Sequence, residues 1–281
     1  MNFTKIYDTL KPKQSYINYY VREYWFAPQD VLLRSIEANI ISAIKFKHPI
    51  LDIGIGDGGI SRFLFSKKLK IDVGVDIDES GLEKARETGV YKKVLCADAQ
   101  NLPFNNASFN AVVSNSTFEH IKDDLAAVEE VSRVLRKNGL FFMTVPNPFL
   151  EKTVLSIEGN GKKAKLALKK FNTRVQHFHY RSLMEWGRIF KKNNMDVLYY
   201  KYYFPEGTTR SWYILMRFSI SKFRKRELWS YLAHSPLNRI IPKKLAIDTL
   251  RNIILKKPYV MGLPSKANIG SMLFLITQKS A

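Results

Sequence analysis

The sequence predicts an α/β fold built on a doubly wound, mainly parallel sheet. Through the first half of the chain, short apolar runs that end in glycine or in an acidic residue alternate with helix-like stretches, as buried parallel strands and their crossover helices do. A cluster of glycines follows the first of these runs, where a strand turns into a helix. Crossovers in such sheets are right-handed, and ligands bind at the carboxyl ends of the strands, so function is expected there.

The predicted elements follow a β-α-β-α-β order. Strands are expected at Pro49–Gly54, Val73–Ile77, Lys93–Asp98, Phe109–Asn115 and Leu140–Val145, and helices at Ile60–Lys68, Glu79–Thr88 and Asp123–Arg136. The pair Asn138-Gly139 is expected to stop the last of these helices. A helix at Ser35–Phe46 precedes this core, and a helix at Arg181–Lys192 with strands at Met195–Phe204 and Ser271–Gln278 follows it.

The last two predicted strands define the domain organisation. If they pair, residues 205–270 form a basic, aromatic-rich insertion between them, and the core comprises residues 1–204 plus 271–281, with a helical cover over residues 1–47. Charge is distributed unevenly. Residues 1–150 carry 19 Lys+Arg and 18 Asp+Glu, residues 151–281 carry 26 and 7, and the insertion alone carries 13 and 3. Nearly all of the net charge of +20 therefore lies in residues 151–281, which favours an anionic partner there, unless these cations only solvate helices.

Composition excludes several classes of protein. A chain with 46% hydrophobic and 13% aromatic residues is neither disordered nor fibrous. Cys96 is the single cysteine and is expected in a buried strand, and no Cys/His cluster has zinc-ligand spacing, so no metal is expected. The N-terminus lacks a secretory signal and no apolar run is long enough to span a membrane. We therefore expect a cytoplasmic protein, with the inner face of the membrane as a second possible location.

The most informative stretch is the glycine loop Leu51–Gly59, which reads L-D-I-G-I-G-D-G-G. Glycines at a strand-to-helix turn let the backbone approach a ligand closely, and the amides at a helix N-terminus favour a negative group. Gly54, Gly56 and Gly59 also fit the fingerprint of dinucleotide-binding proteins. Asp76 lies 22 residues after Gly54, at the end of the second strand, where a carboxylate accepts hydrogen bonds from ribose hydroxyls. A dinucleotide and any other ligand that contains a ribose would both use this acidic residue, so Asp76 alone does not discriminate between them.

Two other acidic residues discriminate between these ligands. Asp52 precedes the first glycine by two residues, where a carboxylate suits a cationic ligand better than a pyrophosphate. Asp98, at the end of the third strand, is placed to accept a hydrogen bond from an adenine amine. Together with V-G-V-D-I at 73–77, A-D-A-x-x-L-P-F at 97–104, F-N-A-V-V-S-N-S-T-F-E-H-I at 109–121 and R-V-L-R-K-N-G-L at 133–140, this pattern closely resembles the class I S-adenosylmethionine-dependent methyltransferases, type 11-like. The resemblance covers about residues 30–146 and continues more loosely to 204.

This resemblance implies a Rossmann-like, seven-stranded sheet whose last strand is antiparallel, with a helical insertion, and S-adenosyl-L-methionine as the cofactor. In that family the matching residues surround the methionine moiety, and here they are Asp52, Gly54, Gly56 and Gly58. Ile55 stands where the family often has a smaller residue or Cys.

The resemblance also implies how the nucleoside is held. The residue matching Asp76 binds the ribose, and the residue matching Ile77 flanks the adenine. Asp98, with the Ala99 amide, reads the adenine edge, and Asn115 offers its backbone carbonyl near the sulfonium.

Methyl transfer is an in-line displacement at the sulfonium methyl, so a base is needed mainly when the acceptor is a hydroxyl. Glu119 and His120 follow the fourth strand directly, and His177 and His179 precede the helix expected at Arg181–Lys192. A neutral imidazole takes a proton near pH 7, so His120, His177 and His179 are the candidate catalytic residues. The alternative for each is a loop histidine that shapes the pocket.

The acceptor is indicated only by indirect features. The D/N-P-P-Y/F motif of enzymes that methylate amino groups is absent, because residues 115–118 read N-S-T-F. Clustered cations beside Trp, Tyr and Phe in residues 205–270 are typical of an interfacial helix. We therefore expect O-methylation of a saccharide or lipid-linked acceptor, with the insertion on an anionic membrane. The alternatives are RNA modification, which lacks a recognised RNA-binding module here, a small-molecule acceptor under an amphipathic lid, and a non-catalytic cofactor-binding protein.

Overall fold

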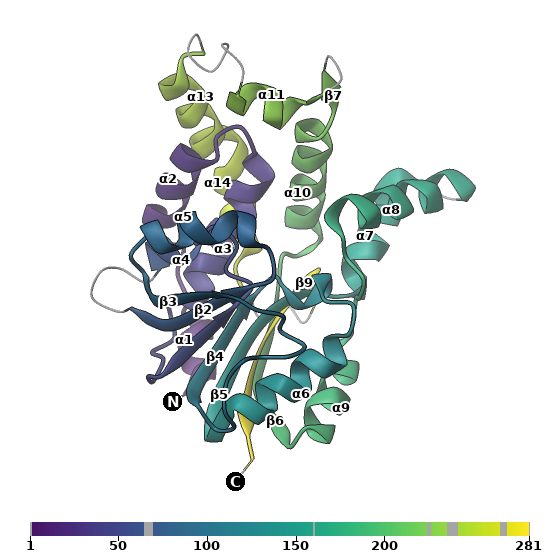
Figure 1. Cartoon of the computed structure of the whole chain (residues 1–281). Coiled ribbons are helices and arrows are strands. Elements are labelled where there is room, and N and C mark those ends of the chain that lie inside the picture. Colours follow the sequence, from purple (N-terminus) through teal and green to yellow (C-terminus); the bar gives the residue numbers. More distant parts are fainter. Residues whose placement is uncertain are drawn as a thin grey trace.

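A seven-stranded sheet forms the centre of the computed structural model, which describes residues 2–64, 70–159, 161–223, 226–234, 241–264 and 269–280 (Figure 1). Across the sheet the strands are β3 (Tyr91–Cys96), β2 (Ile71–Asp76), β1 (Ile50–Ile53), β4 (Phe109–Asn115), β5 (Leu135–Pro146), β9 (Met272–Lys279) and β6 (Met195–Tyr203). The first five are parallel, and β9 runs antiparallel between β5 and β6. The predicted α/β fold with an antiparallel last strand is confirmed.

Helices cover both faces of the sheet. They are α1 (Phe3–Asp8), α2 (Gln14–Glu23), α3 (Pro28–Ile41), α4 (Ser61–Leu64), α5 (Leu82–Glu87), α6 (Asp124–Val134), α7 (Pro148–Glu158), α8 (Lys162–Val175), α9 (Leu183–Lys192), α10 (Glu206–Ser219), α11 (Leu228–His234), α13 (Lys243–Thr249) and α14 (Lys256–Gly262). Short 3₁₀ helices span Glu79–Gly81 and Phe118–His120, a π-helical stretch spans Leu250–Leu255, and β7 (Lys222–Phe223) pairs with β8 (Arg226–Glu227).

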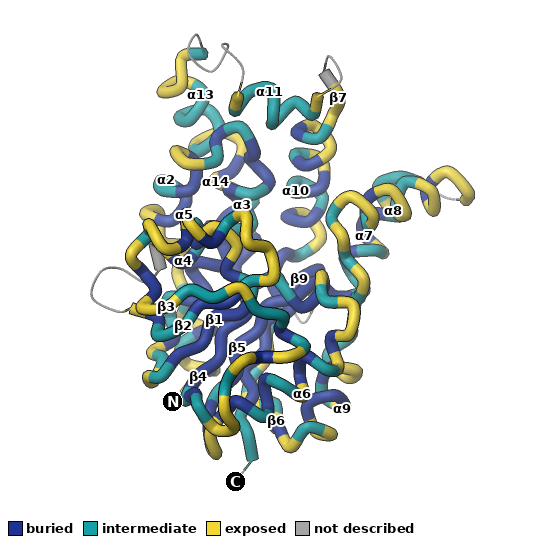
Figure 2. The backbone as a smooth tube through the Cα atoms, viewed as in Figure 1, coloured by how far each residue is buried: buried dark blue, intermediate teal, exposed yellow. Residues whose placement is uncertain are grey.

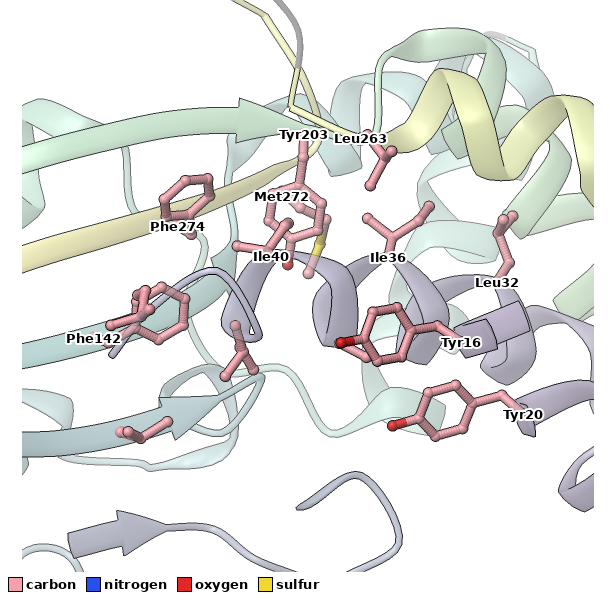
Figure 3. Packing of buried hydrophobic residues seen from close by; sticks show 14 of the residues in the cluster. Tyr16, Tyr20, Leu32, Ile36, Ile40, Phe142, Tyr203, Leu263, Met272 and Phe274 are labelled. Atoms are coloured by element: carbon pink, nitrogen blue, oxygen red, sulfur yellow. The ribbon is translucent and has the colours of Figure 1, made fainter. Parts of the chain in front are cut away.

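Two hydrophobic clusters pack against the opposite faces of the sheet. One joins α1, α2 and α3 to the sheet, and Ile36 and Ile40 of α3 lie among Tyr203, Met272 and Phe274 (Figure 3). The other places α6 and α9 over the opposite face, with Trp186 and Phe190 fully buried. Burial of a large apolar side chain contributes about 1.5–3 kcal/mol, so the strands are held from both sides and their carboxyl ends form a rigid edge.

The elements between β6 and β9 extend above that edge (Figure 1). They are α10 to α14, and they are not separate from the core, because Leu255, Tyr259 and Leu263 belong to the same hydrophobic cluster as α3. The Tyr259 hydroxyl also donates to the Lys13 carbonyl, 2.9 Å away. Of the predicted insertion 205–270, residues 224–225, 235–240 and 265–268 lie outside the described residues, as do residues 65–68 of the predicted helix at 60–68.

Several sequence predictions require correction. The helix expected at 123–136 ends at Val134, and Asn138-Gly139 lies within β5 instead of stopping the helix, because Leu135 already pairs with Phe109 of β4. Cys96 is exposed instead of buried, because it ends β3, the strand at the sheet's edge. The helix expected at 35–46 begins at Pro28 and ends at Ile41. The helices α7 and α8 were not predicted.

The outer part of α8 is among the exposed segments of the chain (Figure 2). This helix carries six cations, Lys162, Lys163, Lys165, Lys169, Lys170 and Arg174, and no acidic residue. Within the described part of the chain, no helix combines the length and the apolar character needed to cross a bilayer.

Candidate functional site

A cavity of about 510 Å³ lies at the carboxyl ends of β1 to β4. Six of the nine residues predicted to bind the cofactor line it: Gly54, Gly56, Asp76, Ile77, Asp98 and Ala99. They come from three strand ends that are adjacent in the sheet, so the sheet order itself brings them together. This cavity is hereafter the cofactor cavity.

The glycine loop forms one wall of the cofactor cavity. Gly54 has φ +80°, and a Cβ there would lie 2.1 Å from the Thr117 hydroxyl oxygen, so no other residue fits. The amide of Gly56 donates to Oδ2 of Asp76, 2.7 Å away, and the Asp78 amide donates to Oδ1 at 2.9 Å. Each carboxylate oxygen keeps a further lone pair, so Asp76 shapes the loop and can still accept hydrogen bonds from a ligand.

The opposite wall is formed by the end of β3 and the residues after β2. Asp98 accepts hydrogen bonds from the backbone and side-chain amides of Gln100, at 2.9 Å each. Ile77 is 67% exposed although it is apolar. An uncovered apolar side chain beside a carboxylate is the arrangement that a planar base with an amine edge requires.

The other three predicted cofactor residues do not line the cavity. The Asp52 carboxylate is buried behind the loop and accepts hydrogen bonds from Ser61 Oγ at 3.0 Å and from the Tyr91 hydroxyl at 2.9 Å. Burial raises the pKa of Asp52 to about 6, although these two hydrogen bonds act in the opposite direction. In this position Asp52 ties the end of β1 to α4 and β3.

Gly58 and Asn115 also lie outside the lining of the cavity. A Cβ on Gly58 would contact Ala85 and Thr88, so this glycine allows the loop to pack on α5. The side-chain amide of Asn115 donates to Glu37 of α3, 2.8 Å away. The backbone carbonyl of Asn115 accepts a hydrogen bond from the Thr117 hydroxyl. Glu37 is fully buried and also accepts from Ser116 and Tyr203. The sequence analysis missed Glu37, which ties α3 to the ends of β4 and β6.

A second, enclosed cavity of about 100 Å³ adjoins the first and is hereafter the chamber. It shares Ser116 and His120 with the cofactor cavity, and Glu119, His177 and Trp212 are among its other lining residues. Glu119 Oε2 and Trp212 Nε1 are buried without a hydrogen-bond partner among the described residues. Burial, with a smaller contribution from the nearby Glu37, raises the pKa of Glu119 to about 8.

The three candidate catalytic histidines are not equivalent. His120 and His177 line the chamber with their ring centroids 5.0 Å apart. Burial lowers the pKa of both imidazoles, that of His177 to about 3 with a contribution from His120, so both are neutral at pH 7. His179 does not line the chamber. Its Nε2 lies 2.8 Å from the Lys122 carbonyl oxygen and 3.9 Å from Asp124, which fits a positioning residue in the loop.

A third, open cavity of about 820 Å³ runs along α8 and is hereafter the groove. Its lining residues are Leu155, Lys165, Leu168, Lys169, Asn172, Thr173, Gln176, His177 and Phe178. His177 is common to the groove and the chamber, and Phe178 is common to the groove and the cofactor cavity. The groove, the chamber and the cofactor cavity are therefore neighbours that share lining residues.

Residues 51–143 match the model of the family described as a methyltransferase domain. An uncharacterized protein of Methanocaldococcus jannaschii is 33% identical over 173 residues, covering 60% of this chain and 62% of that protein. A probable S-adenosylmethionine-dependent methyltransferase of Mycobacterium tuberculosis is 27% identical over 127 residues, covering 45% of this chain and 44% of that protein.

Solved structures share the fold. A methyltransferase from Thermotoga maritima, described as a possible histamine N-methyltransferase, superposes with a TM-score of 0.54 at 17% identity, covering 95% of this chain and 100% of that one. A phosphoethanolamine N-methyltransferase of Haemonchus contortus, in complex with phosphomonomethylethanolamine and S-adenosylhomocysteine, superposes with a TM-score of 0.55 at 18% identity, covering 100% of this chain and 61% of that one.

These relationships concern the core more than the whole chain. The matched segments span 62%, 56% and 44% of the first three curated relatives. The family match covers β1 to β5, the part that builds the cofactor cavity, and the bound S-adenosylhomocysteine of the Haemonchus enzyme is the product form of the cofactor. The chain carries a methyltransferase domain over residues 51–143 and shares its fold with S-adenosylmethionine-dependent methyltransferases.

Proposed function

We propose that this protein transfers a methyl group from S-adenosylmethionine to a hydroxyl of a saccharide, free or lipid-linked. The observation that carries this proposal is that the three cavities are neighbours, since His120 lines both the cofactor cavity and the chamber and His177 lines both the chamber and the groove. The chamber, at about 100 Å³, has room for roughly three water molecules at ~30 Å³ each. It therefore accepts the reacting end of a molecule, while the remainder lies in the groove.

The chamber suits an oxygen acceptor. Trp212 Nε1–H is a buried donor without a described partner, and each chamber imidazole has one nitrogen that accepts a hydrogen bond. A hydroxyl satisfies both, because it donates one hydrogen bond and accepts others. Held in this way, the oxygen attacks the methyl carbon in line with the C–S bond, and S-adenosylhomocysteine leaves while the hydroxyl proton passes to solvent.

The groove suits an acceptor that is both apolar and anionic. Lys165 and Lys169 lie one helical turn apart on its wall, beside Leu155, Leu168 and Phe178. A phosphate-linked lipid carrier presents the same combination of negative charge and apolar chain. A free anionic saccharide would use the lysines alone.

We further propose that residues 205–270 contact an anionic membrane surface. Exposed apolar side chains on these segments include Ile214, Phe218, Leu245, Ile253 and Val260, each more than half exposed. Exposed cations lie next to them in the chain, at Arg217, Lys244, Lys256 and Lys257. Apolar side chains among cations are what an interfacial helix requires, at about 1 kcal/mol per cation near an anionic bilayer.

The test uses the purified full-length protein with methyl-labelled S-adenosylmethionine. The acceptor probes are the organic-phase lipid extract and the aqueous saccharide fraction of cells that lack the protein, and the two fractions distinguish a lipid-linked from a free acceptor. We expect label in an ether-linked O-methyl sugar after acid hydrolysis, identified by mass spectrometry. Label confined to RNA, to protein or to an amine would overturn the proposal. The Asp76→Ala variant described below controls for label that does not depend on the cofactor cavity.

A further inference from the structure

Three side chains of the chamber form a cluster with the composition of a metal site. One carboxylate oxygen of Glu119 and one ring nitrogen each of His120 and His177 lie within 4.8 Å of one another. A divalent ion with bonds of ~2.0–2.1 Å holds tetrahedral ligand atoms about 3.4 Å apart, so rotations of these side chains bring them to bonding distance. Glu119 is only 3% exposed, and its Oε2 has no hydrogen-bond partner among the described residues.

Hydrogen bonds fix the tautomers of both histidines. Nδ1 of His120 lies 3.2 Å from the Gln176 carbonyl oxygen, which can only accept, so Nδ1 carries the hydrogen. Nδ1 of His177 lies 2.9 Å from the Tyr180 hydroxyl. That hydroxyl donates to Asn172 Oδ1 at 2.9 Å, so it accepts from His177 and Nδ1 again carries the hydrogen. Both Nε2 atoms therefore present a free lone pair.

Hydrogen bonds of this kind, from the ring nitrogen that does not bind the ion, hold metal-binding histidines in place. A ligating imidazole donates its other N–H to a carbonyl or another fixed acceptor, which sets the ring orientation. For His177 the hydrogen bonds continue from Tyr180 to Asn172, whose Nδ2 donates to Glu151, 3.1 Å away. The loop that carries His177 is itself fixed to the Glu119 segment, since the Phe178 amide donates to the Glu119 carbonyl at 2.8 Å.

We propose that Glu119, His120 and His177 bind one divalent transition-metal ion, with its open coordination position directed to the acceptor hydroxyl. Two imidazoles and one carboxylate suit Zn²⁺, Fe²⁺, Mn²⁺ or Co²⁺ better than Ca²⁺ or Mg²⁺. The local spacing of Cys and His residues does not predict this metal site, because its ligands come from two segments that only the folded chain brings together.

The catalytic part of this inference rests on the proposed function, whereas the metal site itself does not. A hydroxyl bound to the ion ionises more readily, as bound water does. The O–H bond breaks with its proton released to solvent, the oxygen forms a bond to the methyl carbon, and the C–S bond breaks to give S-adenosylhomocysteine. When the ion is bound, its coordination of the hydroxyl replaces the hydrogen bonds to the imidazole nitrogens.

The metal site is tested with tag-free, full-length protein that has been stripped by a chelator and then titrated with Co²⁺, read by its visible d–d absorption, and with Zn²⁺ in competition. We expect one ion per chain. Glu119→Gln and His177→Gln should each weaken Co²⁺ binding at least tenfold, whereas His234→Gln, an exposed histidine on α11, should leave it unchanged. Binding of S-adenosylhomocysteine, measured by calorimetry, verifies that each variant is folded.

The site and its catalytic role can be overturned separately. Absence of stoichiometric Co²⁺ and Zn²⁺ binding, or equal binding by the stripped wild type and both ligand variants, excludes the site. Full methyl transfer by the stripped protein in chelator excludes the catalytic role while leaving the proposed function intact. Conversely, stoichiometric binding without methylation of either acceptor fraction supports the site and contradicts the proposed function.

Discussion

The Asp76 carboxylate at the end of β2 accepts a hydrogen bond from the Gly56 amide of the glycine loop, with Oδ2 and N 2.7 Å apart. The glycine loop and the end of β2, which both line the cofactor cavity, are therefore linked before any ligand binds. We predict that Asp76→Ala weakens binding of S-adenosylhomocysteine at least tenfold, since a hydrogen bond to a charged group contributes about 1.5–3 kcal/mol. Titration calorimetry measures this effect. Asp78→Ala is the control, because it removes an exposed carboxylate that does not line the cavity, and it should leave the affinity for S-adenosylhomocysteine unchanged. Unchanged affinity in Asp76→Ala would contradict the prediction.

How much of this site the sequence could predict depends on how local its determinants are. Gly54, Gly56, Asp76 and Asp98 follow from short motifs at strand ends, and the parallel sheet places strand ends side by side. The direction of the Asp52 side chain was not predictable, because it depends on Tyr91 of β3 approaching from behind the loop.

The chamber could not be predicted from the sequence either, because its lining also depends on contacts between segments that are distant in the chain. His177 and His179 are two residues apart on the loop, yet one faces the chamber and the other the Lys122 carbonyl. Which of the two histidines faces the chamber depends on how that loop packs against Glu119, and the sequence does not show this packing. The helix α8 escaped prediction because its six cations mask its apolar positions, among them the buried Ala164 and Phe171.

The buried Asp52 predicts a pH dependence of stability. Its pKa is about 6 in the folded protein, above the ~3.9 of an unfolded Asp, so the folded state binds the proton more tightly. This contribution to the free energy of unfolding is fully present below about pH 4 and is lost as the pH rises to about 6. One pKa unit corresponds to about 1.4 kcal/mol, so the loss is about 3 kcal/mol.

The Asp52→Asn variant isolates this effect. We predict that its unfolding free energy, relative to wild type, increases by about 2 kcal/mol between pH 4 and pH 7, measured by urea denaturation, because an unfolded Asp is already about half ionised at pH 4. Asp196→Asn is the control of opposite sign. The hydrogen bonds from Lys191 and Ser280 lower the pKa of Asp196, so removing that carboxyl should cost more as the pH rises. A pH-independent difference between Asp52→Asn and wild type would show that Asp52 does not titrate in this range.

The exposed apolar side chains of α10 predict binding to anionic membranes. Ile214 is 58% and Phe218 62% exposed, with the exposed Arg217 between them in the chain. We predict that Ile214→Ser/Phe218→Ser reduces sedimentation of the full-length protein with phosphatidylglycerol-containing vesicles, and that wild-type binding weakens with added salt. The control is Met184→Ser/Leu198→Ser, which changes exposed apolar residues of α9 and β6, away from the insertion (Figure 1). Equal binding of wild type to neutral phosphatidylcholine vesicles would contradict an electrostatic contact.

The last prediction concerns the two lysines on the wall of the groove. Lys165 and Lys169 line it, whereas Lys163 and Lys170 of the same helix do not. We predict that Lys165→Glu/Lys169→Glu raises the half-saturating amount of the acceptor fraction at least tenfold and leaves the maximal rate of methyl transfer within about twofold. The reason is that contacts far from the reacting atoms bind the ground state and the transition state equally. Lys163→Glu/Lys170→Glu makes the same change of charge on the same helix and should alter neither quantity. Equal effects of the two pairs would mean that the net charge of α8, and not the groove, attracts the acceptor.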